Sequence, residues 1–383
     1  MGRFKRNEVI ALLGAGASVD AGIPHSKSMI NRVEGLIRNG NEWGEYEDLY
    51  NFVKSSIKYG EGVRGKFGEV INYNIERLVN TLEELNKKED HPLYPFVGSW
   101  IPRLSEVSGS NFANISDLRD KIVERLRERW LEVEHDVDSE YYAALEDLQA
   151  QYEHPLRVFT LNYDLCVEEN CDEEILERGF EDQKWDWQRF ELDRENIYLY
   201  KLHGSTDWYR EDGRLQYKNP NLIDDDEVEI IFGTTQKVQY VDPFLFFAYE
   251  LRKWTLSHAK LIICIGYGFG DEHINSILGQ ALRQDERKRL LTVSPMSQGE
   301  KEVKKRILRS LNLTNSDQIE CFPMTAEEFM LDHMDLEYLA EEVFPDEEPP
   351  FEEVTTTPSG TEPSTAVEAS PDVDAARSDS AAS

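Results

Sequence analysis

Short apolar runs that are rich in β-branched residues recur along the chain and predict buried parallel strands. The five strongest runs are Val9–Leu13, Arg157–Leu161, Ile197–Leu202, Lys260–Ile265 and Leu290–Val293, and a weaker sixth is Ile319–Phe322. Helical patterns lie between most of these runs. That alternation is typical of an α/β fold, and it predicts a doubly wound, Rossmann-like parallel sheet.

The segment from about residue 26 to residue 151 follows a different pattern. It is rich in helical periodicity, as in Asn72–Lys88 and Ile115–Glu134, and it contains no convincing strand. We interpret it as a helical insertion packed over the strand ends. Further along, Tyr209–Lys218 favours a small hairpin, and the acidic run Asp224–Glu229 favours a solvated loop.

Composition changes sharply near the carboxyl terminus. Residues 344–383 are rich in Pro, Ser, Thr and acidic residues and nearly devoid of large apolar ones. We therefore predict one folded domain over residues 1–343 and a disordered acidic tail over residues 344–383. The whole chain carries a formal net charge of -33, so we expect no direct binding of nucleic acid, which needs clustered Lys and Arg.

Other bulk features restrict the location and the redox chemistry. No apolar run approaches the roughly 20 residues of a membrane span, and the first residues show no cleavable signal pattern. We therefore expect a cytoplasmic protein without membrane contact. The four cysteines, Cys166, Cys171, Cys264 and Cys321, include no C-x-x-C pair. We expect reduced core thiols and no metal site.

Small residues fill the turn that follows the first predicted strand. The turn reads Gly14, Ala15, Gly16, Ala17 and Ser18, and it continues through Gly22, Ile23 and Pro24. Such residues let backbone N–H groups approach a pyrophosphate at the positive end of the following helix. A plain tight turn is the alternative. Val19 stands where the hydride-transferring dehydrogenases carry a third glycine, so an ordinary dehydrogenase is disfavoured.

Polar or glycine-rich clusters follow the other predicted strands as well. They are Asn162–Asp164, His203–Ser205, Gly266–Asp271 and Ser294–Pro295. Ligands of an open parallel sheet bind outside the carboxyl ends of its strands, so we expect these clusters to face one crevice. Structural alternatives exist for each: Asn162 and Asp164 could cap the next helix, His203 could occupy a turn, and Asp271 is predicted to cap a helix that begins near Glu272.

Taken in order, the motifs G-A-G-A-S with A-G-I-P, T-L-N-Y-D, K-L-H-G-S and I-G-Y-G-F-G-D-E-H-I-N resemble those of the Sir2 family. More narrowly, they resemble its SIR2-like branch in prokaryotic antiviral defence. The resemblance covers about Glu8 to Pro295 and implies that NAD+ is bound. It assigns the phosphate loop to Gly14, Ala15, Gly16 and Ser18, with Gly22, Ile23 and Pro24 as its continuation. It also implies nicotinamide and ribose contacts for Asn162 and Asp164, a catalytic role for His203, and adenosine contacts for Gly266, Tyr267 and Ser294.

Two departures from the family pattern bear on the reaction. Pro24 is followed by His25, Ser26 and Lys27 in place of an Asp-Phe-Arg type segment, and the four-cysteine zinc module is missing. Both disfavour lysine deacylation. The defence branch implies an NAD+ glycohydrolase that releases nicotinamide and ADP-ribose and so depletes NAD+.

For that reaction, we hypothesise that Asn162 orders a water or the carboxamide beneath the anomeric carbon, and that Asp164 holds the nicotinamide side. His203 would hydrogen-bond a ribose hydroxyl or take the proton of the water. The resemblance further implies a homo-oligomer and a co-encoded partner such as a HerA-like ATPase or a short Argonaute. The alternatives are a non-catalytic sensor of NAD+ or ADP-ribose and an NAD-dependent protein deacylase.

Overall fold

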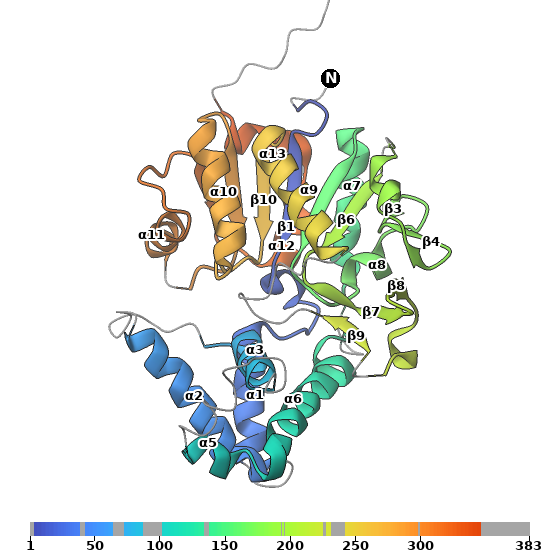
Figure 1. Cartoon of the computed structure of the whole chain (residues 1–383). Coiled ribbons are helices and arrows are strands. Elements are labelled where there is room, and N and C mark those ends of the chain that lie inside the picture. The colour runs from blue at the N-terminus through green and yellow to red at the C-terminus, as the bar shows by residue number, and fades with distance from the viewer. Residues whose placement is uncertain are drawn as a thin grey trace, which may run out of the picture. The chain divides into compact units, whose positions relative to one another are not determined.

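Seven parallel strands form the main sheet of the computed structural model (Figure 1). In spatial order they are β12 (Ile319–Phe322), β11 (Arg289–Val293), β10 (Leu261–Ile265), β1 (Val9–Leu13), β2 (Leu156–Thr160), β6 (Ile197–Lys201) and β3 (Leu176–Glu177). The structure describes residues 4–38, 43–63, 73–86, 102–133, 138–192, 194, 196–224, 227–230, 242–297 and 299–345. All six predicted runs are strands, which confirms the predicted fold class. The tail predicted from residue 344 lies outside the described residues except for Phe344 and Pro345.

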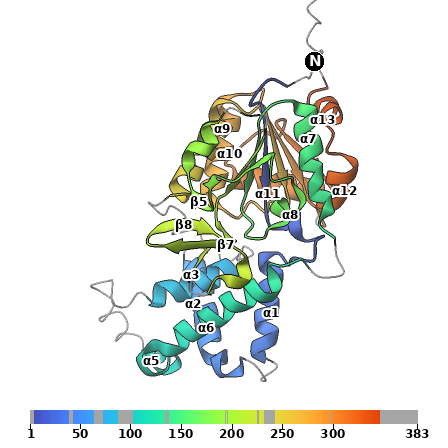
Figure 2. The same ribbon diagram turned by 90° about the vertical axis from the view of Figure 1, so that its right-hand side faces the viewer.

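Each longer strand of the sheet divides its side chains between two cores. On β1, Val9, Ala11 and Leu13 pack into one core, whereas Ile10 and Leu12 pack into the other. Figure 2 shows the helices on the two faces of the sheet. One face carries α9 (Phe244–Ser257), α10 (Glu272–Gln284) and α11 (Glu300–Ser310), and the other carries α7 (Ala144–Tyr152), α12 (Ala326–Asp332) and α13 (Leu336–Val343). Burial on both faces explains why the strands are apolar at nearly every position.

The described part of the segment from residue 26 to residue 151 is helical and contains no strand. Its helices are α1 (Ser26–Arg38), α2 (Glu47–Glu61), α3 (Ile75–Asn86), α5 (Pro102–Val107), α6 (Ala113–Arg125), a π-helical turn (Leu126–Trp130) and α7. In Figure 1, α1, α2, α3, α5 and α6 lie beyond the carboxyl ends of the strands. The last helix, α7, instead contacts β6, α12 and α13 on the sheet. None of the described helices is long and apolar enough to cross a membrane.

A second, antiparallel sheet lies near the carboxyl ends of the strands of the main sheet (Figure 1). In spatial order its strands are β4 (Phe180–Glu181), β5 (Lys184–Trp185), β8 (Arg214–Tyr217), β7 (Gly204–Glu211) and β9 (Val228–Ile230). The predicted hairpin is confirmed as β7 and β8, which are joined by an Asp212–Gly213 turn with φ of 50° and 77°. The predicted loop at 224–229 was wrong at its end, because Val228 and Glu229 belong to β9, which pairs with β7. Residues 225 and 226 of that loop lie outside the described residues.

Candidate functional site

Parallel pairing brings the ends of four strands to one level. Leu13 at the end of β1 is in register with Thr160 of β2 and with Ile265 of β10, and Thr160 is in register with Lys201 of β6. The loops that follow these strands therefore start side by side. We call this side of the sheet its carboxyl edge, and all the motif residues predicted to bind NAD+ lie in the loops that leave it.

The loops after β1 and β10 are in direct backbone contact. Gly14 N donates to the carbonyl oxygen of Ile265, and Gly16 N donates to that of Gly266, both at 2.9 Å. A Cβ on Gly14 would lie 2.6 Å from Tyr267 Cα, and one on Gly16 would lie 2.7 Å from Gly266 Cα. Loop packing thus requires both glycines, a reason that the sequence analysis did not identify.

We expect Gly266→Ala to lower the free energy of unfolding by about 1–3 kcal/mol. Gly266 has a φ of +64°, and a Cβ there would lie 2.1 Å from the backbone nitrogen of Ala17. Urea unfolding would measure the loss. Gly268→Ala is the matched control, because a Cβ at Gly268 meets nothing within 4 Å. Equal stability of the two variants would contradict the proposed loop contact.

A buried cluster of polar side chains surrounds Ser18. Ser18 Oγ donates to Asp164 Oδ2 at 2.8 Å, and Asn162 Nδ2 donates to Ser18 Oγ at 2.9 Å and to the Gly14 carbonyl oxygen at 3.1 Å. The Tyr142 hydroxyl lies 2.8 Å from Ser18 Oγ, whose own hydrogen goes to Asp164, so Tyr142 is the donor. Burial, reinforced by the charge of Asp164, raises the pKa of Tyr142 well above its usual value and keeps this donor protonated.

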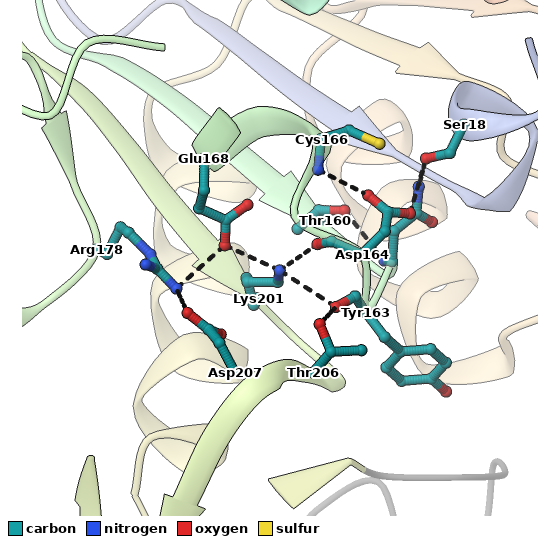
Figure 3. Close-up of polar contacts among 11 residues, drawn as sticks. Ser18, Thr160, Tyr163, Asp164, Cys166, Glu168, Arg178, Lys201, Thr206 and Asp207 are labelled. Carbon is teal, nitrogen blue, oxygen red and sulfur yellow. Dashed lines mark hydrogen bonds and ion pairs between the residues drawn. The ribbon is translucent and has the colours of Figure 1, made fainter. Parts of the chain in front are cut away.

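This cluster fixes the orientation of the Asn162 carboxamide. Both hydrogens of its Nδ2 are donated to the protein, so the carbonyl Oδ1 is the atom left to meet a ligand. Asp164 Oδ1 also accepts from Cys166 N at 3.3 Å, at the start of α8 (Cys166–Asn170), which Figure 3 shows. The alternative that these two residues cap the next helix therefore accounts for part of the role of Asp164. It does not account for Asn162, whose side chain donates its hydrogen bonds to the loop after β1.

A pocket of about 420 Å³ opens beside Asn162. We call it the Asn162 pocket. Its lining comprises Ala15, Ile23, Pro24, Ser26, Met29, Ile75, Glu76, Leu126, Leu131, Leu161, Asn162, Tyr163 and Asp164. Five of these residues were predicted to bind NAD+ or to act on it.

His203 lies in a different cavity, the His203 hollow, with a volume of about 300 Å³. It is lined by Leu202, His203, Phe244, Ala248, Asp271, His273 and Ile274. His203 Nε2 is 3.5 Å from Asp271 Oδ2, and both side chains are buried. Tyr163 adjoins both cavities, because it lines the Asn162 pocket and its ring centre is 6.3 Å from that of His203. The structure does not bring Asn162 and His203 into one cavity.

Asp271 also caps α10, as predicted. Its Oδ1 accepts from His273 N at 2.9 Å and from Ile274 N at 3.3 Å. One carboxylate therefore fixes the helix start with one oxygen and faces His203 with the other. This arrangement links the position of the His203 ring to the start of α10.

Seven residues predicted to hold NAD+ line neither cavity: Gly14, Gly16, Ser18, Gly22, Gly266, Tyr267 and Ser294. The buried Tyr267 hydroxyl donates to Asn275 Oδ1 at 2.9 Å. Ser294 is half-buried, and its backbone N donates to the Phe322 carbonyl oxygen at 3.2 Å. Gly22 has a φ of 82° and closes a turn by donating to the Val19 carbonyl oxygen at 3.0 Å.

Charged residues that the sequence analysis did not assign to the site hold the turn of Asn162 in place (Figure 3). Lys201 is 1% exposed, and its Nζ donates to Glu168 Oε1 at 2.9 Å and to the backbone carbonyl oxygen of Asp164. Arg178 pairs with Glu168 at 3.2 Å and with Asp207 at 2.6 Å. Although burial alone would raise the pKa of Asp207, Arg178 and Lys201 hold it below its usual value.

A signal for this network is present in the sequence. Lys201 ends an otherwise uncharged, fully buried strand, Ile197–Lys201, and a buried lysine must be paired. Tyr142 and Glu76 gave no such signal, because neither belongs to a motif. Among the described residues, Cys166, Cys171 and Cys264 are buried free thiols, Cys321 is partly buried, and no three His, Cys, Asp or Glu side chains could hold a metal ion.

Residues 156–316 match the protein family described as a SIR2-like domain. This segment runs from β2 through α11 and includes the loops that carry Asn162, Asp164, His203 and Gly266, but not the loop after β1. No protein with a curated description matches the chain.

Several solved Sir2 structures are similar to the chain at low identity. A triple mutant of a Sir2 homologue in complex with 2'-O-acetyl-ADP-ribose is 13% identical, covering 88% of this chain and 93% of that one, with a TM-score of 0.44. A mutant Sir2 homologue with ADP-ribose is 14% identical, covering 87% and 92%, with a TM-score of 0.41. Sir2Tm with a propionylated peptide is 12% identical, covering 87% and 92%, with a TM-score of 0.39.

Proposed function

We propose that this protein is an NAD+ glycohydrolase, which cleaves the bond between nicotinamide and ribose and releases nicotinamide and ADP-ribose. The observation that carries the proposal is the fixed carboxamide of Asn162 at the carboxyl edge, beside a pocket that Asp164 also lines. The SIR2-like segment supports NAD+-related chemistry in general. The step from there to hydrolysis rests on the geometry of these residues and on the departures from the deacylase pattern.

Asn162 would position the attacking water or the nicotinamide carboxamide through its Oδ1. As nicotinamide leaves, the ribose becomes cation-like, and preoriented protein dipoles and carboxylates stabilise that charge. The electron pair of the broken carbon–nitrogen bond goes to the ring nitrogen, which makes nicotinamide neutral. The water oxygen bonds to the anomeric carbon and gives up one proton. Apolar lining residues such as Met29, Ile75 and Leu126 would limit access of other waters.

His203 would take the proton of the water or hold a ribose hydroxyl. Asp271 faces its Nε2 at 3.5 Å and would orient the ring. His203 and Asn162 line different cavities. This role therefore requires the ribose or the attacking water to extend beyond Tyr163 and contact His203. A bound substrate that shifts the Tyr163 ring would join the two cavities.

The biological setting that we propose is antiphage defence in the cytoplasm, where the enzyme would deplete NAD+. This part of the proposal rests on the motif resemblance. It includes assembly into a homo-oligomer and activation by a co-encoded HerA-like ATPase or short Argonaute. The helical region from residue 26 to residue 151 is a natural place for contacts that gate the pocket.

Release of nicotinamide from NAD+ by the purified full-length chain tests the proposed activity. Chromatography would follow nicotinamide and ADP-ribose, for the chain alone and with each co-encoded partner, with and without an acyl-lysine peptide. We expect equimolar products whether or not the peptide is present. Acyl transfer to ribose would show a deacylase instead, and tight NAD+ binding without release would show a sensor.

A further inference from the structure

The helical region contributes one carboxylate to the Asn162 pocket. Glu76 lies in the first turn of α3, is half-buried, and lines the pocket together with Asn162 and Asp164. Ser26 Oγ, at the start of α1, lies 3.5 Å from Glu76 Oε1. Acidic side chains from two parts of the chain therefore line the pocket: Asp164 from the loop after β2 and Glu76 from the helical region.

The two carboxylates differ in their surroundings. Asp164 is 6% exposed, and its oxygens accept from Ser18 Oγ at 2.8 Å and from Cys166 N at 3.3 Å. Lys201 Nζ also donates to its backbone carbonyl oxygen. These donors hold the Asp164 carboxylate in place beside the pocket. Among the described lining residues, Glu76 is the other carboxylate, and it comes from the helical region.

The surroundings of Glu76 strengthen its electrostatic effect. Met29, Ile75, Leu126 and Leu131 line the same pocket, and an apolar lining lowers the local dielectric constant. The negative charge of Glu76 also acts on Tyr163, the residue that adjoins His203. Burial raises the pKa of the Tyr163 hydroxyl well above its usual value, and the negative charge of Glu76 raises it further.

We propose that Glu76 is a catalytic carboxylate of this pocket and that it recognises the positive charge of the substrate. It would face the pyridinium ring of bound NAD+ and then stabilise the cation-like ribose as that charge moves from the ring to the sugar. The inference rests on the proposed function. It gives the helical region a direct part in the chemistry and makes the pocket selective for the oxidised, cationic form of the nucleotide.

Comparison of NAD+ with NADH separates this role from a structural one, since only NAD+ carries the pyridinium charge. We expect Glu76→Gln to weaken NAD+ binding by about tenfold, to leave NADH binding within about twofold, and to slow nicotinamide release further. Calorimetry would measure both affinities. Glu84→Gln is the matched control, because Glu84 is exposed on the same helix and its replacement removes the same charge.

Equal weakening of NAD+ and NADH, or no change in either affinity, would overturn the role of Glu76. If the wild-type chain binds NAD+ but releases no nicotinamide, the glycohydrolase proposal fails while the affinity ratio still decides the role of Glu76 in charge recognition. A wild-type chain that binds neither nucleotide would overturn both proposals.

Discussion

Replacing His203 with alanine is expected to lower the rate of nicotinamide release by about 10²- to 10⁴-fold, the usual contribution of a general acid or base. The affinity for NAD+ should stay within about tenfold, because the residue lines the His203 hollow and not the Asn162 pocket. Single-turnover kinetics and calorimetry would measure the two quantities separately. A loss confined to affinity would contradict a role in proton transfer.

The hollow itself supplies a control for this experiment. His273 lines the same cavity, but it is exposed, whereas His203 is 4% exposed and faces Asp271. We therefore expect His273→Ala to change the rate by no more than about twofold. If His203→Ala also left the rate unchanged, His203 would be excluded from the mechanism. Asn162 and His203 would then line separate cavities in the active enzyme as well.

The main sheet could be predicted from the sequence because each of its longer strands is buried on both faces. In so acidic a chain, a run of about five consecutive apolar residues, as in Leu261–Ile265, indicates a strand that is buried on both faces. The two-residue strands β3, β4 and β5 carry no pattern of this length. Their existence depends on pairing with distant segments, such as Lys184 with Gln216.

The site was predictable where it depends on topology and not where it depends on side-chain direction. Parallel strands must end together, so the motif residues Gly14, Asn162 and Gly266 had to meet. The contact of Ser18 with Tyr142 joins residues 124 positions apart, through a segment whose path the helical pattern does not specify. Likewise, no pattern revealed that the His203 ring faces α10 and lines a cavity of its own.

Lys201→Met is expected to cost about 3–5 kcal/mol of unfolding free energy, the usual penalty for breaking a buried ion pair. Glu168 would lose the closer of its two cations, and the carbonyl oxygen of Asp164 would lose a buried donor. Urea unfolding would measure the loss. Lys305→Met is the control, because the Lys305–Glu302 pair is exposed and should contribute less than about 1 kcal/mol.

Acid unfolding gives this prediction a second, independent readout through Asp207. Its pKa in the folded protein lies below its usual value, so Asp207 stabilises the protein above about pH 4 and loses that effect as the pH falls through the folded-state pKa. Lys201 is one of the two cations that hold this pKa down. In Lys201→Met the folded-state pKa of Asp207 should rise toward its unfolded value, so the unfolding free energy of the variant should fall less than that of the wild type as the pH is lowered below about 4. An equal fall in both proteins would mean that Arg178 alone sets the charge of Asp207, and that Lys201 acts only on the turn that carries Asn162 and Asp164.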